Sequence, residues 1–104
     1  MAQAVGMIEV YGLVAAFAAC DAGCKAADVT VEPFDKNKPA DPRGLQVPLQ
    51  ILVKFRGNVE SVTAAVEAAE AAANAISGVV QKHIIPAMET GAEGMLHLNA
   101  YDKN

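Results

Sequence analysis

The sequence predicts an α+β domain of the ferredoxin-like type, with the element order β-α-β-β-α-β. Four short apolar segments are typical of strands, and alanine-rich segments with helical spacing separate the first from the second and the third from the fourth. Gly12 and Gly78 mark junctions between these segments. Two such units pack as a four-stranded antiparallel sheet with both helices on one face. This arrangement serves many functions, so the fold class alone indicates none.

The four strands are expected at residues 4–10, 29–34, 49–55 and 79–85. In the first strand Ile8 alternates with Met7 and Glu9, as side chains do on the two faces of a sheet. Pro33 cannot donate a ladder hydrogen bond, which indicates that the second strand is an edge strand or ends there. Residues 35–48 contain three prolines and five charges, and they are predicted to form a loop.

The two helices are expected at residues 13–27 and from Val59 to a stop at Gly78, with Asn58 as the N-cap of the second. The apolar stripe of the first helix is expected at Leu13, Phe17, Cys20 and Cys24. The alanines on its remaining surface suit close approach to a neighbour. The apolar stripe of the second helix is expected at Val59, Val62, Val66, Ala69, Ala73 and Ile76.

Length and composition favour one small domain that works as an oligomer. A chain of 104 residues is too short for two independent cores. Its 53% of hydrophobic residues are largely alanine, and there is no tryptophan. Alanine offers little apolar area to bury, so an isolated monomer would have a thin core. Contacts between subunits would add to it.

The charge and the hydropathy of the chain argue against nucleic-acid binding and against a membrane-spanning segment. The net charge is −4 without a basic cluster, which argues against nucleic acid, since phosphate binding needs grouped lysines and arginines. The apolar stretch from Leu13 to Cys20 is far shorter than the roughly 20 residues that a membrane span needs. The N-terminus lacks the pattern of an export signal, so the expected compartment is the cytoplasm.

The reactive side chains form no catalytic or metal-binding set. Cys20 and Cys24 are interpreted as two small buried thiols. His83 and His97 lie far from them without metal-ligand spacing, and His83 is interpreted as a structural residue. No nucleophile with a base beside it and no phosphate-binding glycine loop is visible. We therefore expect a protein that is not an enzyme and that needs no metal and no cofactor.

Three segments in a fixed order carry a family resemblance. Gly6-Met7-Ile8-Glu9-Val10-Tyr11-Gly12 leads into the first helix, Phe55-Arg56-Gly57-Asn58-Val59 into the second, and Lys82-His83-Ile84-Ile85-Pro86 closes the last strand. Together they resemble the bacterial microcompartment shell proteins of the single-domain type, which assemble as hexameric tiles. The resemblance covers residues 4 to 86 and implies a shell domain over 1–87. The residues that follow have Met95-Leu96-His97-Leu98 between Gly-rich and polar stretches, and we interpret 88–104 as a mobile C-terminal tail with one short ordered piece.

The resemblance implies a structural function and its partners. Members of the family form the walls and pores of the shell and do not act as catalysts. We therefore expect a homohexamer in a microcompartment shell within the cytoplasm. Its partners would be other shell proteins and encapsulated enzymes, and small metabolites would cross its pore.

In this family the connection between the second and third strands lines the pore on the sixfold axis. Here that connection runs from Lys36 to Pro48 and is longer than the short Gly/Ser turn common in the family. The candidate pore residues are Lys36, Lys38, Asp41, Arg43, Gly44 and Gln46. Their mixed charge suggests a polar collar that passes small polar or anionic metabolites. The alternative is an ordinary solvated loop directed away from the axis.

Two further positions bear on contacts between hexamers. Lys25 matches a lysine that the family places at the tile edge near the end of the first helix. Ala87 stands where the family tends to have an arginine that inserts into an edge pocket. Losing that guanidinium predicts weak tiling by this protein alone, or mixing with a related shell protein.

Two other functions remain open at the level of the sequence. One is an oligomeric regulatory protein that binds a small ligand on the same fold, with the long charged loop closing over it. The other is a small acyl- or phosphoryl-hydrolysing enzyme that would use Arg56 and Asn58, although a helix cap explains Asn58 more simply.

Overall fold

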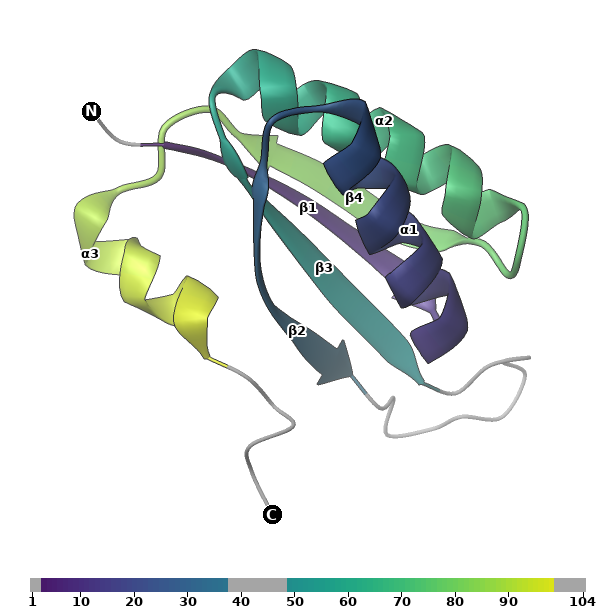
Figure 1. Cartoon of the computed structure of the whole chain (residues 1–104). Coiled ribbons are helices and arrows are strands. Elements are labelled where there is room, and N and C mark those ends of the chain that lie inside the picture. Colours follow the sequence, from purple (N-terminus) through teal and green to yellow (C-terminus); the bar gives the residue numbers. More distant parts are fainter. Residues whose placement is uncertain (1–2, 38–48, 99–104) are drawn as a thin grey trace.

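The computed structural model describes residues 3–37 and 49–98 of the chain (Figure 1). Its strands are β1 (Ala4–Tyr11), β2 (Thr30–Asn37), β3 (Gln50–Gly57) and β4 (Val79–Ile85). Its helices are α1 (Leu13–Ala26), α2 (Val59–Asn74), the short α3 (Thr90–Glu93) and the 3-10 helix η1 (Gly94–His97). None of the described helices is long and apolar enough to cross a bilayer.

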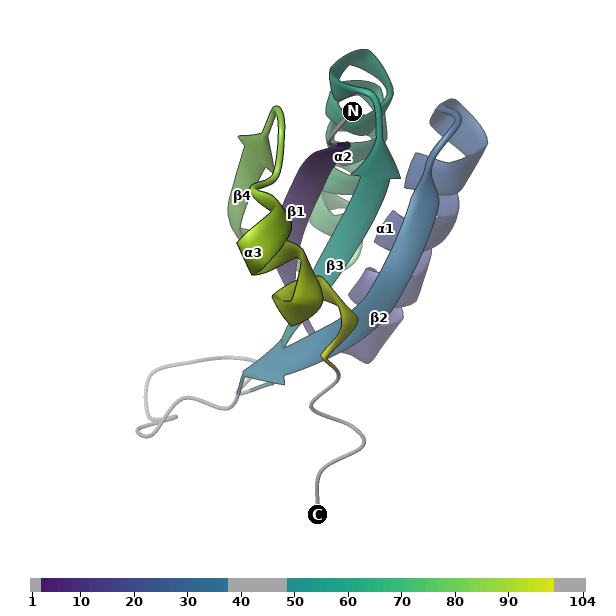
Figure 2. The same cartoon turned by 90° about the vertical axis from the view of Figure 1, so that its left-hand side faces the viewer.

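The four strands form one antiparallel sheet in the order β2-β3-β1-β4. Helices α1 and α2 cover one face of it, as Figure 2 shows with the sheet seen from its other side. This confirms the predicted element order and the placement of both helices. Strands β2 and β4 are the two edges, and the β2–β3 register shifts between Glu32 and Asp35, around Pro33.

Strand β2 is longer than predicted and includes the first residues of the expected loop. Asp35, Lys36 and Asn37 pair with Leu52, Ile51 and Gln50 of β3. The predicted strand end at Phe34 and the loop start at residue 35 were therefore wrong. Pairing with a neighbouring strand satisfies the backbone of these polar residues, which outweighs their local preference for turns.

The apolar core lies between the sheet and the two long helices. Phe55, Ile8 and Ile51 are its largest fully buried side chains. Helix α1 contributes only small residues to it, namely Ala15, Ala16, Ala19 and Gly23. A Cβ at Gly23 would overlap the ring of Phe55, so α1 approaches β3 as closely as the backbone allows.

The predicted apolar stripe of α1 was therefore wrong. Leu13 is 41% exposed, Phe17 is 61% exposed and Cys24 is exposed. Close approach of α1 to its neighbours favours the alanine face, because larger side chains would hold the helix away from the sheet. The neighbour that some of these alanines approach is the core of the chain itself.

Helix α2 begins as predicted but ends at Asn74, so that a turn over residues 75–77 separates it from the expected stop at Gly78. The Asn58 side chain accepts a hydrogen bond of 2.7 Å from the Ser61 N–H, as an N-cap does. After the helix, Gly78 takes a positive φ of 128° and donates its N–H to the Ala73 carbonyl at 3.0 Å. The expected stripe is buried in its middle, at Val62, Val66, Ala69 and Ala73. Its two terminal members, Val59 and Ile76, are half-exposed.

The C-terminal segment has more regular structure than the one short piece that we predicted, since α3 and η1 together run from Thr90 to His97. Helices α3 and η1 lie beside the sheet face opposite to α1 and α2 (Figure 2). Leu96 is 4% exposed there, and the Met88 N–H donates to the Gln3 carbonyl at 3.1 Å. The segment therefore covers part of a face that would otherwise be open.

Candidate functional site

The expected pore loop leaves the sheet at one end of the strands. Asn37 ends β2 opposite Gln50, and the Gly12 N–H donates to the Leu49 carbonyl at 2.9 Å. The two strands that flank residues 38–48 therefore end beside the start of α1. We call this the loop end of the molecule.

The structure places only one of the candidate pore residues. Lys36 is exposed on β2, one residue before its end, and its backbone N–H donates to Asp35 Oδ1 at 2.9 Å. The other five lie outside the described residues, namely Lys38, Asp41, Arg43, Gly44 and Gln46. Lys36 thus stands at the base of the connection that we expected to line a pore.

The two expected edge positions lie toward the opposite end of the strands. Lys25 is in the last turn of α1, which leads to Thr30 at the start of β2. Ala87 is exposed just after β4, whose Ile85 pairs with Val5 near the start of β1. Because Thr30 pairs with Arg56 at the same end of β3, both edge positions lie away from the loop end.

Lys25 is held by a partner on its own helix. Its Nζ lies 2.8 Å from Asp21 Oδ2, and both side chains are well exposed, at 76% and 62%. This hydrogen bond and the charge of Asp21 raise the pKa of Lys25 above its ordinary value. Because solvent screens such a surface pair, little free energy opposes the release of Lys25 toward another partner.

An apolar groove lies between α1 and the edge strand β2. Its volume is about 470 Å³, and its walls are Leu13, Phe17, Cys20, Val31, Glu32, Pro33 and Phe34. The rings of Phe17 and Phe34 meet edge to face, with centroids 5.2 Å apart and planes at 68°. Sequence reasoning missed this groove because it assigned Leu13 and Phe17 to the core.

Two buried cations lie on the sheet face that the C-terminal segment covers. Lys54 is 2% exposed, and its Nζ donates to the carbonyls of Leu96 at 2.8 Å and Leu98 at 3.2 Å. Burial lowers the pKa of Lys54, while the charges of Asp35 and Glu32 act in the opposite direction. The carbonyls of Leu96 in η1 and of Leu98 directly after it are thus the acceptors that offset the cost of burying this ammonium.

Arg56 is the second buried cation and holds three elements together. It is 6% exposed, its Nε donates to the Ala4 carbonyl at 3.3 Å, and it pairs with Glu93 at 2.5 Å and with Glu32 at 3.6 Å. His97 Nδ1 lies 3.1 Å from the same Glu32. The guanidinium that the hydrolase alternative would need for a substrate phosphate is therefore occupied by structural contacts.

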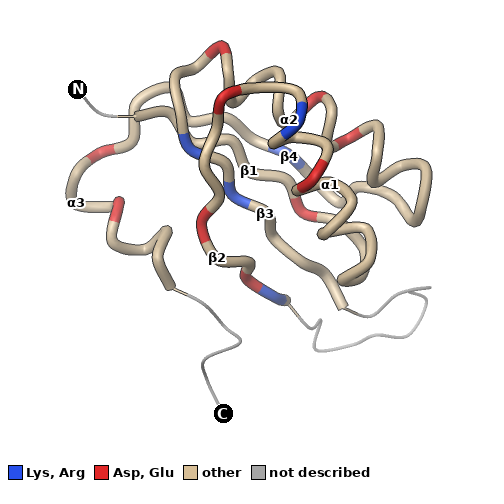
Figure 3. The backbone as a smooth tube through the Cα atoms, in the orientation of Figure 1, with Lys and Arg blue, Asp and Glu red and all other residues tan. Residues whose placement is uncertain are grey.

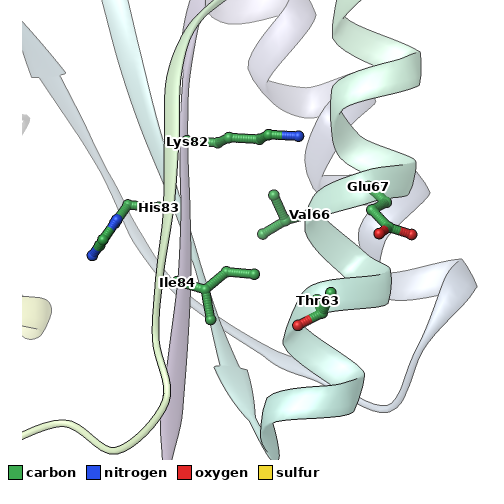
Figure 4. Close-up of a pocket in the computed structure, with 6 residues that line it drawn as sticks. All are labelled: Thr63, Val66, Glu67, Lys82, His83 and Ile84. Atoms are coloured by element: carbon green, nitrogen blue, oxygen red, sulfur yellow. The ribbon is translucent and has the colours of Figure 1, made fainter.

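A smaller pocket of about 280 Å³ lies between α2 and β4 (Figure 4). Lys82 reaches across it toward α2 and pairs with Glu70 at 2.8 Å, whereas His83 points to the other side of β4. Among the described residues no group of three His, Cys, Asp or Glu side chains is placed to hold a metal ion.

The two cysteines differ from the prediction that both are buried. Cys20 is half-buried, and burial, followed by the influence of Cys24, raises the pKa of its thiol to about 11. Cys24 is exposed. In Figure 3 the basic residues of the described chain are distributed along the backbone of α1, β2, β3 and β4.

Comparison with known proteins agrees with this geometry. The family model of the BMC domain matches residues 4–88. The bacterial microcompartment shell protein PduA of Citrobacter freundii is 37% identical over 94 residues, which cover 90% of this chain and 91% of that protein. The carboxysome shell protein CcmK2 of a Synechocystis species is 38% identical over 87 residues, covering 82% of this chain and 76% of that protein.

A solved structure shares the fold. A microcompartment protein from Desulfitobacterium hafniense superposes with a TM-score of 0.71 at 24% identity, and the match covers 93% of this chain but 48% of that one. This chain therefore spans about half the length of that solved chain, and the likeness is one of fold. The family match and the two shell-protein relatives carry the assignment: the chain belongs to the BMC-domain family of bacterial microcompartment shell proteins.

Proposed function

We propose that this protein is a structural tile of a bacterial microcompartment shell in the cytoplasm and that it works as a cyclic homohexamer. The observation that carries the proposal is the BMC-domain match over residues 4–88, together with relatives named as shell proteins over most of the chain. Other shell proteins and encapsulated enzymes are the proposed partners. These relatives do not favour the regulatory alternative.

The arrangement of the sheet supports a ring. Its two edges, β2 and β4, are different surfaces on opposite sides of the chain. When unlike surfaces of identical subunits meet, each copy uses one surface on the copy before it and the other on the copy after it. Such head-to-tail contacts close into a ring if a whole number of equal rotations between neighbouring subunits makes a full turn. In a closed ring every sheet edge lies against a neighbouring subunit.

The two ends of the strands carry different expected sites, which supports a ring with one end at its axis and the other end at its rim. Lys36 marks the loop end, while Lys25 and Ala87 lie toward the opposite end. We place the loop end at the sixfold axis and the other end at the rim, where neighbouring tiles meet. On this arrangement a strand and its helix run outward from the axis.

Residues 36–48 are the proposed lining of the central pore. Sixfold symmetry repeats each charge six times, and two like charges about 8 Å apart repel by about 0.5 kcal/mol in water. A ring of Arg43 alone would therefore repel itself, whereas Asp41 two residues away supplies the opposite charge. We propose a collar of mixed charge that passes small polar or anionic metabolites and that carries no catalysis.

Molar mass by light scattering tests the assembly. A particle near six times the chain mass of 10.8 kDa supports the hexamer. A trimer would favour the regulatory alternative, and a monomer at high concentration would contradict the ring.

Flux tests the pore separately. Shells assembled with Arg43→Glu should pass a small organic anion more slowly than wild-type shells and a neutral solute of the same size at the same rate. Equal anion flux in both shells would contradict the role of the charge.

A further inference from the structure

A small pocket of about 230 Å³ lies on the sheet face opposite to α1 and α2, the face that Figure 2 shows. The strand register forms it. Glu9 of the inner strand β1 pairs with Leu52 on one side and with Gln81 on the other. Met7, two residues earlier on the same face of β1, pairs with His83. Two adjacent rows of side chains from one chain therefore surround the pocket. Its lining residues are Met7, Glu9, Leu52, Gln81, Lys82 and His83.

Glu9 is the acidic side chain of this pocket, and it is almost buried, with 9% of its surface exposed. Its side-chain partner among the described residues is Gln81, whose Nε2 donates to Glu9 Oε1 at 3.0 Å. An amide carries no charge, so this hydrogen bond leaves the carboxylate without a counter-ion. Buried charges in proteins are usually paired with an opposite charge, because the loss of hydrating water is otherwise costly.

The cations near the pocket have other partners. Lys54 pairs with Met7 in the sheet, but its Nζ donates to two carbonyls of the C-terminal segment. Lys82 belongs to the pocket wall, but its ammonium reaches toward α2 and pairs with Glu70 at 2.8 Å (Figure 4). His83 is the other titratable group that turns to this face. The pocket thus presents a carboxylate that no lysine or arginine of the described chain contacts.

The pocket has the chemistry to hold an ammonium group on a short aliphatic chain. An ammonium donates several hydrogen bonds, and both the Glu9 carboxylate and the side-chain carbonyl of Gln81 are acceptors. Met7 and Leu52 offer apolar surface to the carbon chain. The volume lies below the range of about 300–1,000 Å³ that is common for larger ligands, so the ligand must be small.

A divalent metal ion fits this pocket less well. Mg²⁺ and Ca²⁺ prefer several oxygen ligands, usually with more than one carboxylate. Among residues 3–37 and 49–98, no three His, Cys, Asp or Glu side chains are grouped to hold a metal.

We propose that this pocket binds a small primary ammonium ion, which pairs with Glu9 while its carbon chain packs against Met7 and Leu52. All of these residues belong to one chain, so the inference goes beyond the proposed tile and does not depend on the ring. A lysine of a neighbouring copy would carry the same group. The position on the inner strand β1, away from the two sheet edges, favours a free amine.

The methyl signals of methionine report on the pocket directly. Met7 lines it, whereas Met95 is 65% exposed on η1 and does not. In protein labelled with 13C at the methionine methyls, n-propylammonium chloride should shift the Met7 signal to saturation and leave the Met95 signal in place. Sodium chloride at the same concentration is the blank. 1-Propanol has the same carbon chain without the charge and should bind at least about tenfold more weakly.

Two matched variants test the role of the carboxylate. Glu9→Gln removes the charge and keeps the shape, so n-propylammonium should bind at least about tenfold more weakly. Glu67→Gln is the control, because Glu67 is an exposed carboxylate on α2 that lines other pockets, and it should keep the wild-type affinity. Equal binding by Glu9→Gln and the wild type, or equal binding of the amine and the alcohol, would overturn the proposal. If Glu9→Gln did not fold, the comparison of amine and alcohol on the wild type would decide.

The state of assembly distinguishes a free amine from the lysine of a neighbouring copy. A Met7 shift in the intact particle, at a concentration where light scattering finds no dissociation, supports a site for a free amine. A shift that appears only after dissociation would show that a neighbouring copy fills the pocket, and it would overturn the proposal. The molar mass itself tests the ring, and a monomeric wild type that still binds the amine would refute the ring and leave this site standing.

Discussion

The positions without a side chain decide how closely the two long helices approach the sheet. A Cβ at Gly23 would overlap the Phe55 ring, and one at Gly6 would lie 2.7 Å from Val66 Cγ2. Close approach, rather than an unusual backbone conformation, is therefore what these two glycines provide. Their neighbours are fully or almost fully buried and have no free space to move into.

Gly23→Ala should lower the free energy of unfolding. Overpacking a filled core typically costs about 1–3 kcal/mol, which outweighs the gain of up to about 1 kcal/mol that alanine brings to a helix. The control is Gly94→Ala, since a Cβ there meets nothing within 4 Å. Denaturant unfolding at equal protein concentration measures both variants, and equal midpoints would contradict the close approach of α1.

The two cysteines should differ in reactivity. With a pKa of about 11, Cys20 holds only about 0.1% of its thiol as thiolate at pH 8, and it is half-buried as well. Cys24 is exposed on the same helix. In variants that retain one cysteine each, maleimide should label Cys24 at least tenfold faster than Cys20. Equal labelling rates would show that Cys20 is no less accessible than Cys24, which would contradict the orientation of α1 on the sheet.

At the scale of elements, patterns that depend on neighbours along the chain were predicted correctly. The order of strands and helices, the Asn58 cap and the Gly78 stop all follow from local spacing and backbone chemistry. The inward face of α1 was not predicted correctly, because it depends on how close β3 comes to the helix. The extension of β2 to Asn37 also depends on a distant partner, here β3.

The site was predicted to a similar extent. The sequence assigned Lys36 to the loop, whereas it lies on β2, and it placed Lys25 near the end of α1, where it lies. The roles of both residues in a pore and at a tile edge stay predictions. The α1–β2 groove could not be predicted, since Phe17 and Phe34 come together only in the folded chain. The same holds for Lys54, whose acceptors follow it by more than forty residues. The boundary between a domain at 1–87 and a tail stays a prediction.

The C-terminal segment should dock as a unit on the sheet. Leu96→Ala removes its buried anchor, and such a truncation costs about 2–5 kcal/mol where the structure cannot relax. If the segment undocks by itself, as we predict, the observed loss is limited to its docking free energy. Amides of residues 91–98 should exchange hydrogen faster, while those of β1 and β3 keep their protection.

A matched control keeps this test specific. Leu98, which is 46% exposed at the end of the same segment, can be changed to alanine with little effect expected. If Leu96→Ala left exchange in the segment unchanged, or accelerated exchange throughout β3, independent docking would be wrong.

At the scale of the whole molecule, the strands separate two surfaces with different proposed tasks. In the proposed ring, the loop end faces the axis, and the end with Lys25 and Ala87 faces the next tile. Ala87 lacks a guanidinium, which can form several directed hydrogen bonds across a seam. We therefore predict weak tiling from this one position and no effect of it on the ring.

Ala87→Arg should therefore strengthen tiling without changing the mass of the ring. Ala87 is exposed, so the longer side chain fits without disturbing the core. Negative-stain images at a fixed concentration should show larger flat sheets than the wild type, and Ala87→Gln serves as an uncharged control. Extended sheets formed by the wild type alone would contradict the weak seam.

The central claim is that six copies surround an axis at the loop end of the chain, and a cryo-EM map of the purified protein tests it most directly. The account predicts a sixfold ring in which the connection from β2 to β3 borders the central opening and Lys25 lies at the rim. A map of a single protomer, or a ring whose centre is formed by another part of the chain, would contradict it.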